Sequence, residues 1–376
     1  MPNRKQIIFC TDGFFPHAIG GMQRHSSLLL NELALSNEFD LIVVHSHKNA
    51  VLDQLPNVKE YPLNFDLFNL KYLNYLYKCY QFSKEVYKVI QQYPEAIIYA
   101  QGFAVWYGLK KIGHRVIVNP HGLEPFQTIE FKDKIITSTY RIVERFQFKY
   151  AAKVVSLGGR LTEILKKVVV DAKNKVVVLP NAVYAENYQE HNYDKTKLQL
   201  LFVGRFAYNK GINVLMEGVR QLNNEGYQNR LQFNIVGKGP LYEQYIREYK
   251  FPNVNFIGFA DDERLKQLYL ENDLFVFPTL FEGMPTVVLE AMAAGMPILV
   301  SDTGATSELV NRENGFLIEK NNVRSLKCGI QQFFQLNPEE RKTLSKNSYK
   351  KVCTKFTWQI VAKKHAELFN TFNIDK

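Results

Sequence analysis

The sequence lacks the marks of a membrane-spanning, secreted or metal-binding protein. Only four of its 376 residues are cysteine, and none stands in a Cys-x-x-Cys or Cys/His spacing typical of a zinc site or a disulfide framework. No apolar stretch approaches the roughly 18 uncharged residues that a membrane-spanning helix needs. The first apolar run, "IIFC" at 7–10, is too short for the core of a signal peptide. We therefore expect a cytoplasmic protein with no metal site.

Two families of binding motif are also missing. No G-x-G-x-x-G fingerprint follows a predicted strand, so a nicotinamide dinucleotide site is not supported. The sequence pI of about 9.1 raises nucleic acid as a partner, but the chain carries no RRM, KH or zinc-finger signature. Its basic residues are also spread among many segments. We expect no nucleic-acid partner.

The positive charge is concentrated in the N-terminal half. Residues 1–180 hold 23 Lys and Arg against 15 Asp and Glu, whereas residues 181–376 hold 24 against 22. A basic half favours an anionic partner such as a phosphate group or a membrane surface. The alternative is that these basic residues only form a solvated surface, which explains the same charge counts.

Short β-branched runs alternate with helical patterns along the whole chain. This rhythm predicts an α/β protein of the doubly wound type, with parallel sheets covered by helices on both faces. The expected strands form two series, which at this length indicates two Rossmann-like domains facing across a cleft. The first series is 6–10, 40–46, 96–101, 115–121, 153–158 and 175–181; the second is 198–205, 231–239, 253–258, 273–278, 296–302 and 315–319.

The domain boundary is expected in the polar segment 180–197, which is poor in Val, Ile and Leu. The N-terminal domain then spans 1–180 and the C-terminal domain 181–356. A C-terminal helix at about 357–376 is a candidate to pack back on the first domain. In open α/β sheets, ligands bind at the carboxyl ends of the strands. The loops that follow the strands are therefore the places to look for a site.

Two loops of the N-terminal half are candidates. "TDGFFPHAIGGMQRH" follows the first strand, and its Gly20 and Gly21 precede a helix whose N-terminus favours an anion. "VNPHGLEPF" places His121 at a strand end. A Gly-Gly pair is often an ordinary turn and a single histidine is often structural, so each signal is weak by itself.

Three loops of the C-terminal half carry stronger signals. "FVGRFAYNKGI" puts Arg205 and Lys210 after a strand, where two cations can hold a diphosphate. "IVGKGPL" opens a helix after Gly237. "LFEGMPTVVLEAMAAG" places Glu282 before a turn and Glu290 on the helix behind it, and ionised carboxylates are acceptors suited to sugar and ribose hydroxyls. Between them lie Gly283, Met284, Pro285 and Thr286, which form the turn and helix start.

These motifs resemble the retaining nucleotide-sugar glycosyltransferases of the GT-B fold, above all the large family four. Glu282 and Glu290 match its E-x7-E motif, and "GRFAYNKGI", "VGKGPLYEQY" and "GATSELVNRENGFLI" look like its donor domain. "FPHAIGGMQRH", "NPHGLE" and "VVVLPNAV" resemble N-terminal motifs of the family. The resemblance covers most of the chain, strongly over 198–319 and patchily over 48–150.

The resemblance implies a role for each matching residue. Arg205 and Lys210 would hold the donor diphosphate, Glu282 would contact sugar hydroxyls, and Glu290 would bind the ribose. Gly20 and Gly21 would approach the diphosphate, His121 would face the donor sugar, and Gly237 and 283–286 would line the donor site. The chain departs from the family at Ala182 and Ala305, where the family often has glycine. No Asp-x-Asp stands at a strand end, so metal dependence of the GT-A kind is not supported.

The resemblance implies an enzyme without a cofactor. It would move a sugar, with retention and front-face attack, from a nucleotide-diphosphate sugar to a hydroxyl of a glycan or lipid-linked acceptor. A UDP-sugar is the expected donor, and cell-surface polysaccharide or glycolipid synthesis the expected setting. A GT-B sugar-nucleotide epimerase, a phosphorylase, a soluble small-molecule glycosyltransferase and a catalytically inactive sugar-binding protein are the alternatives.

Two basic and aromatic segments suggest where such an enzyme would work. Segments 66–93 and 131–150 are expected to form amphipathic helices that favour peripheral binding to an anionic membrane surface. Their aromatics packing in a core beneath a solvated lysine face is the alternative. The first carries Phe68, Tyr72, Tyr75, Tyr80 and Tyr87 with Lys71, Lys78, Lys84 and Lys88; the second carries Phe146, Phe148 and Tyr150 with Lys132, Lys134, Arg141, Arg145 and Lys149.

Overall fold

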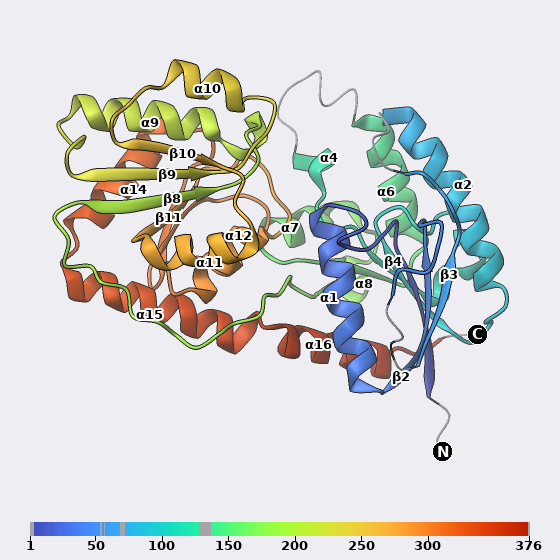
Figure 1. The fold of residues 1–376 in the computed structure, drawn as a ribbon. Coiled ribbons are helices and arrows are strands. Elements are labelled where there is room, and N and C mark those ends of the chain that lie inside the picture. The colour runs from blue at the N-terminus through green and yellow to red at the C-terminus, as the bar shows by residue number, and fades with distance from the viewer. Residues whose placement is uncertain (1–3, 53–54, 56, 68–71, 128–136, 375–376) are drawn as a thin grey trace. The chain divides into compact units, whose positions relative to one another are not determined.

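The computed structural model describes residues 4–52, 55, 57–67, 72–127 and 137–374. The chain divides into two compact units. Unit 1 comprises residues 1–181 together with 358–376, and unit 2 comprises residues 182–357. The chain therefore leaves unit 1 after Asn181 and returns to it at Trp358 with its last helix (Figure 1).

Unit 1 is built on a seven-stranded parallel sheet with the order β3-β2-β1-β4-β5-β6-β7. Its strands are β1 (Lys5–Cys10), β2 (Phe39–His45), β3 (Val58–Pro62), β4 (Ile97–Gln101), β5 (Val116–Asn119), β6 (Lys153–Ser156) and β7 (Val176–Val178). Its helices are α1 (Gly21–Ser36), α2 (Tyr72–Ile90), α3 (Leu109–Ile112), α4 (Glu124–Gln127), α6 (Ser138–Tyr150), α7 (Gly159–Val168), α8 (Ala172–Lys175) and α16 (Trp358–Thr371), with the 3₁₀ turn η1 (Gly113–Arg115).

Helices cover both faces of this sheet because alternate strand residues point to opposite sides. Ile8 and Ile98 pack with Phe82 of α2 on one face. The neighbouring Tyr99 turns to the other face, where its ring contacts Phe369 of α16 at a centroid distance of 5.4 Å. Helix α1 packs against α16 on that same side (Figure 1). The last helix of the chain thus completes the core of unit 1.

Unit 2 has a six-stranded parallel sheet with the order β10-β9-β8-β11-β12-β13. Its strands are β8 (Leu198–Val203), β9 (Leu231–Val236), β10 (Val254–Gly258), β11 (Leu274–Phe277), β12 (Ile298–Ser301) and β13 (Gly315–Ile318). Its helices are α9 (Ile212–Asn224), α10 (Tyr242–Glu248), α11 (Asp262–Glu271), α12 (Thr286–Ala293), α13 (Thr306–Leu309), α14 (Val323–Gln335) and α15 (Pro338–Lys355), with the 3₁₀ turn η2 (Tyr208–Lys210).

Local sequence signals start the helices of unit 2 where the structure has them. Asp261 caps α11 by accepting the backbone N–H of Arg264, and Asn322 caps α14 by accepting that of Ser325. Helix α15 begins with Pro338 after Asn337, which forms a capping box with Glu340. On the sheet, α9 packs with α14 over one face and α12 packs with α15 over the other (Figure 1).

Two parallel Rossmann-like sheets in an α/β chain confirm the predicted fold class. The sequence pattern missed β3, because "VKEYP" is short, carries two charges and is only half buried at the edge of its sheet. The two segments predicted as amphipathic helices contain α2 and α6, but both described helices are shorter than predicted. Phe68, Lys71, Lys132 and Lys134 lie outside the described residues. The alternative, in which the aromatics pack in the core, is confirmed for Phe148, which is fully buried, and Tyr75, Tyr87, Phe146 and Tyr150 also pack against a buried cluster of unit 1.

Candidate active site

The order of the strands identifies the place in unit 2 where a ligand would bind. From β8 the chain proceeds outward through β9 and β10 on one side, then returns to β11 on the other side and proceeds through β12 and β13. Strands β8 and β11 are therefore neighbours whose following loops run to opposite sides. Such a topological switch point leaves a crevice at the carboxyl ends of the strands, where open α/β sheets bind ligands.

Lys210 and Glu282 meet at this switch point. Lys210 ends η2 in the loop after β8, and Glu282 lies in the loop after β11. The ammonium Nζ of Lys210 donates to the carboxylate Oε1 of Glu282 at 2.6 Å. The hydroxyl of Thr279 donates to the same oxygen at 2.9 Å. Because the side chains are only 25% and 11% exposed, this ion pair fixes both groups in position with little screening from water.

Arg205 follows β8 directly and is exposed. Its backbone carbonyl accepts the N–H of Ala207 in a tight turn. That turn directs a permanent cation into solvent on the same loop that carries Lys210. The two cations predicted to hold a diphosphate therefore differ in setting, since Lys210 is engaged by a carboxylate and Arg205 stands in water.

The predicted turn from Gly283 to Thr286 starts α12. Pro285 is the N-cap residue, Thr286 is the first helical residue, and Met284 is almost fully buried beneath the turn. The carbonyl of Gly283 accepts the N–H of Ala305 at 2.8 Å, which ties the turn to the loop after β12. This leaves the N-terminal end of α12 at the same strand edge as the Lys210–Glu282 pair.

Glu290 lies one helix turn further along α12. Its Oε2 accepts the hydroxyl of Tyr269, on α11, at 3.0 Å. Its side chain is neither fully buried nor fully exposed. The two glutamates of the E-x7-E motif are therefore held by different partners: Glu282 by an ammonium and a threonine hydroxyl, and Glu290 by a tyrosine hydroxyl.

Glycines allow the loops at this edge to touch backbone to backbone. At Gly237, with φ of 131°, a Cβ would lie 1.9 Å from the carbonyl oxygen of Gly204. At Gly304, with φ of 54°, a Cβ would lie 2.3 Å from the carbonyl oxygen of Glu282. Gly237 was predicted as a ligand contact. The structure gives it a packing reason, because it lets the loop after β9 press against the residue that precedes Arg205.

The glycines predicted in unit 1 lie at its own switch point, between β1 and β4. Gly20 is the N-cap of α1, and Gly21 is the exposed first residue of the helix. Asp12 of the same loop accepts the side-chain amide of Gln23 at 2.8 Å. Burial raises the pKa of Asp12 to about 6. Sequence reasoning missed Asp12, although an acid directly after the first strand was a signal that could have found it.

His121 is held by a network of neutral side chains within unit 1. It follows β5 with φ of 60°, and its backbone N–H donates to Asn119 Oδ1 at 3.0 Å. Its Nε2 hydrogen-bonds to Oε1 of Gln101, at the end of β4. Its ring lies 4.9 Å from the ring of His25, on the second turn of α1. Burial, with the charge of His365 as a smaller cause, lowers the pKa of His121 to about 3, so the ring is neutral at physiological pH.

The network extends to the last helix of the chain. Asn119 donates through Nδ2 to the hydroxyl of Tyr99 at 3.1 Å, and that hydroxyl hydrogen-bonds to Nε2 of His365 on α16 at 2.9 Å. Burial also lowers the pKa of His365, to about 4. Helix α16 therefore supports the loop that carries His121 as well as the core of unit 1.

The structure brings the predicted residues together in two groups. Arg205, Lys210, Gly237, Glu282 to Thr286 and Glu290 lie at one edge of the unit 2 sheet, while Gly20, Gly21 and His121 lie at the corresponding edge of the unit 1 sheet. Among the described residues, no group of three or more His, Cys, Asp or Glu side chains is arranged to hold a metal ion.

Comparison with known proteins identifies this architecture. Residues 183–351, almost the whole of unit 2, match the family model described as Glycosyl transferases group 1. Unit 2 is therefore a group 1 glycosyltransferase domain. An uncharacterized glycosyltransferase of Methanocaldococcus jannaschii is 26% identical over 360 residues, which cover 92% of this chain and 93% of that protein.

Two further proteins extend the comparison. The UDP-Gal:alpha-D-GlcNAc-diphosphoundecaprenol alpha-1,3-galactosyltransferase of Escherichia coli is 27% identical over 333 residues, 82% of this chain and 83% of that protein. The solved sucrose-phosphate synthase of Thermosynechococcus elongatus superposes with a TM-score of 0.79 at 20% identity, over 98% of each chain. The second likeness shows that this glycosyltransferase has the GT-B fold.

The structure also shows residues of this glycosyltransferase that support the site but belong to none of the sequence motifs. Thr279 and Tyr269 position the two glutamates, and Gly304 lets the loop after β12 support the backbone of Glu282. The two hydroxyl residues carry no motif of their own. "TLFEG" did place a threonine three residues before the glutamate, which was the available signal for Thr279.

We predict that Gly304→Ala lowers sugar transfer at least tenfold. The new methyl group collides with the carbonyls of Glu282 and Gly283, so the glutamate loop must shift. Gly226→Ala is the matched control, since Gly226 also has a positive φ, 87°, but has no atom within 4 Å of a Cβ position. Transfer rate and melting temperature are measured for both variants. Equal loss of transfer in the two would show that backbone strain, not displacement of Glu282, is responsible.

Proposed function

We propose that this glycosyltransferase is a retaining, metal-independent enzyme that uses a nucleotide-diphosphate sugar as donor. The observation that carries the proposal is the Lys210–Glu282 ion pair at the switch point of unit 2, with Arg205 exposed on the same loop. This places two cations and a carboxylate at the one edge of the sheet where the fold binds ligands.

The cations suit the charge that the reaction develops. When the bond between the sugar carbon and the diphosphate breaks, negative charge grows on the leaving phosphate oxygens. Arg205 can grip those oxygens through its planar guanidinium, and the N-terminal end of α12 offers a further positive potential. An ammonium has three N–H donors, so Lys210 can contact a phosphate while it keeps its hydrogen bond to Glu282.

The two glutamates are assigned to different parts of the donor. Glu282 is held rigidly at the switch point and is assigned to hydroxyls of the transferred sugar. Glu290 lies further along α12 beside Tyr269 and is assigned to the ribose hydroxyls. Neutral His121 can exchange hydrogen bonds with the sugar, because it carries one donor and one acceptor nitrogen.

Transfer proceeds with attack on the face that the diphosphate leaves. The oxygen of the acceptor hydroxyl forms a bond to the sugar carbon as the carbon–phosphate oxygen bond breaks. The hydroxyl proton passes to an oxygen of the leaving diphosphate. Retention of configuration follows from this geometry, and no enzymic nucleophile takes part.

A UDP-sugar is the proposed donor and a lipid-linked glycan the proposed acceptor, in the synthesis of a cell-surface polysaccharide or glycolipid. Both are supported by the E. coli relative, whose name specifies UDP-galactose and a diphosphoundecaprenol acceptor.

Sugars on such lipids are accessible only at a membrane surface. No helix in the described part of the chain is long and apolar enough to cross a membrane. We propose peripheral association through the basic helices α2 and α6 on the cytoplasmic side.

The donor assignment predicts that Arg205→Ala and Lys210→Ala each lower turnover by about 10²-fold, the loss typical of removing one charge-stabilising group. Exposed Arg205 should not affect folding. Removal of Lys210 also takes the cation from Glu282, so Lys210→Met, which keeps an apolar side chain of similar bulk without the charge, is measured beside it. The assay follows release of the nucleoside diphosphate from UDP-, GDP- and ADP-sugars. Wild-type turnover in Arg205→Ala would show that the diphosphate lies elsewhere, and a free sugar isomer formed without acceptor would indicate an epimerase.

We expect substitutions of the two glutamates to change different kinetic constants. Glu282→Ala should lower kcat, because the sugar changes charge and shape in the transition state. Glu290→Gln should mainly raise KM for the donor, because the ribose is bound alike in the ground and transition states. Initial rates over a range of donor concentrations separate the two effects. The same change in kcat and KM for both variants would contradict the separate assignments.

Peripheral association predicts salt-sensitive binding to anionic vesicles. The triple variant Lys78→Glu, Arg145→Glu and Lys149→Glu reverses exposed charges on α2 and α6 and should abolish co-sedimentation with phosphatidylglycerol vesicles at low salt. The control reverses exposed Lys320, Lys346 and Lys350 of unit 2. Equal binding of both variants, or binding to neutral vesicles alone, would favour a soluble acceptor.

A further inference from the structure

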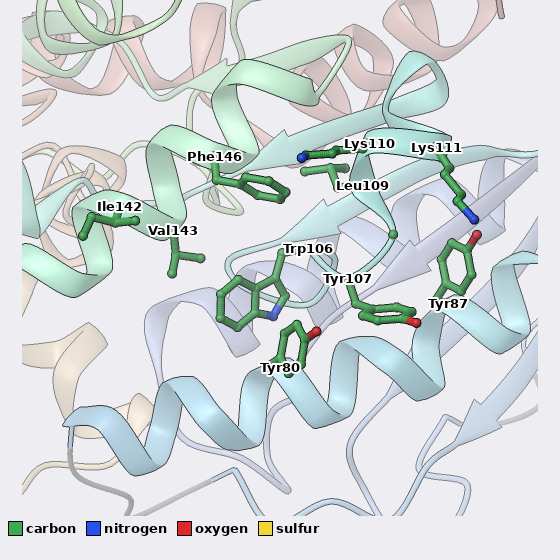
Figure 2. A pocket seen from close by; sticks show the side chains of 11 residues that line it. Tyr80, Tyr87, Trp106, Tyr107, Leu109, Lys110, Lys111, Ile142, Val143 and Phe146 are labelled. Carbon is green, nitrogen blue, oxygen red and sulfur yellow. The ribbon is translucent and has the colours of Figure 1, made fainter.

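Unit 1 contains a pocket of about 580 Å³ that no residue of the candidate active site lines. Four elements form its walls (Figure 2): helix α2 with Tyr80 and Tyr87, the loop after β4 with Trp106 and Tyr107, helix α3 with Lys110 and Lys111, and helix α6 with Ile142 and Phe146. Its size lies within the range of about 300–1,000 Å³ found for small-molecule sites.

Ring contacts and hydrogen bonds hold the aromatic wall of the pocket in place. The rings of Tyr80 and Trp106 pack edge to face at 5.2 Å, and those of Tyr87 and Tyr107 at 5.4 Å. The hydroxyl oxygen of Ser83 accepts the backbone N–H groups of both Trp106 and Tyr107, at 2.8 and 2.9 Å. The loop is thus fastened to α2, which keeps the wall in place without a ligand.

The pocket offers apolar surface together with a donor that lacks a partner. Ile142 is 68% exposed although it lines the cavity. The indole Nε1–H of Trp106 is buried and has no hydrogen-bond partner among the described residues. A buried indole N–H normally finds an acceptor. The apolar lining, with Ile142 exposed on it, suits a ligand with an apolar body.

The charges around the pocket specify an anion. Lys110 and Lys111 line it, and the ammonium of Lys84 lies over the rings of Tyr80 and Tyr107 at 4.9 and 5.8 Å. Few carboxylates oppose these cations. On α2, Glu85 is paired with Lys88. On α6, burial raises the pKa of Glu144 to about 8, so that it is largely uncharged at neutral pH.

The same loop connects the pocket to His121. Gln101 hydrogen-bonds to the His121 ring, and Trp106 follows only five residues later. Five residues span at most about 18 Å, even when fully extended. Gln147 of α6 fixes the intervening backbone by donating to the carbonyls of Gly102 and Val105, each at 3.0 Å. An acceptor whose sugar lies beside the donor sugar at His121 is therefore close enough to extend its distal part to the pocket.

We propose that this pocket binds the first isoprene units of a polyprenyl phosphate lipid, with the lysines at its rim holding the phosphate. The inference deepens the proposed function, on which it rests, by giving the lipid-linked acceptor a specific subsite. A single narrow chain suits a cavity of this volume, and the aromatic rings and Ile142 provide apolar contacts. Lys110 and Lys111 supply charge complementarity to a phosphate.

Tryptophan fluorescence of the full chain provides the test. The chain has two tryptophans, Trp106 in the pocket and Trp358 buried in the core of unit 1. Farnesyl phosphate, added without nucleotide sugar, should change the emission of the wild type with a saturable dependence. Trp106→Phe should remove that change. Farnesol and inorganic phosphate, each carrying half of the chemistry, should bind at least tenfold more weakly.

Matched variants test the walls of the pocket. Ile142→Glu places a carboxylate against the apolar chain and should raise the Kd for farnesyl phosphate at least tenfold. Val170→Glu is the control, because Val170 is a similarly exposed residue of unit 1, 72% exposed, that does not line the pocket. Lys110→Glu with Lys111→Glu should weaken farnesyl phosphate but leave farnesol unchanged.

Several results would overturn the inference. One is an emission change that persists in Trp106→Phe, and another is no emission change of the wild type with farnesyl phosphate. Equal affinities of Ile142→Glu and Val170→Glu for farnesyl phosphate, or tighter binding of a short-chain phosphatidylglycerol than of farnesyl phosphate, would also contradict it. Failure of the proposed function looks different, since it would be the absence of transfer from any nucleotide sugar to any acceptor. Transfer to a lipid-linked acceptor with the same acceptor KM in Ile142→Glu and wild type would refute the pocket alone.

Discussion

The parallel direction of all the strands that the structure describes is the constraint on which the rest of this structure depends. Because neighbouring strands run the same way, all carboxyl ends within a sheet meet at one edge, and chemistry-bearing loops far apart in sequence become neighbours. Lys210 and Glu282 are 72 residues apart, yet they form a 2.6 Å ion pair across the β8–β11 switch point. Buried parallel strands need cover on both faces, which the helices provide in each unit. The strand order of each sheet therefore decides which side chains meet at the carboxyl ends of its strands.

Much of this could be predicted from the sequence, for reasons that particular residues make clear. Runs such as "LFVF" at 274–277 are apolar without alternation, because both faces of a parallel strand are buried, and this sets them apart from the helices around them. The turn residues 283–286 placed the start of α12 closely, since Pro285 is its N-cap residue. The E-x7-E spacing and the cations after β8 were local in sequence, and so the motif could be recognised without coordinates.

What could not be predicted depends on contacts between distant segments. Nothing in "KQLYLEND" at 266–273 marks Tyr269 as the partner of Glu290, because that hydrogen bond requires α11 and α12 to lie side by side. Phe148 has the spacing of an apolar helix face, but the periodicity alone cannot tell whether that face meets a membrane or the protein core, where Phe148 lies. The aromatic pocket is a similar case: its walls come from three segments between residues 80 and 146, and the orphan indole N–H of Trp106 is visible only once they are assembled.

The return of α16 to unit 1 has a consequence for the order in which the chain can fold during synthesis. Every residue of unit 2, from Ala182 to Thr357, is synthesised before Trp358, His365 and Phe369 are added to the chain. Those three residues are buried in unit 1. Domains generally fold as units as they emerge. The unit that begins first is therefore completed last, and the loop that carries His121 gains its full support only after unit 2 has been synthesised.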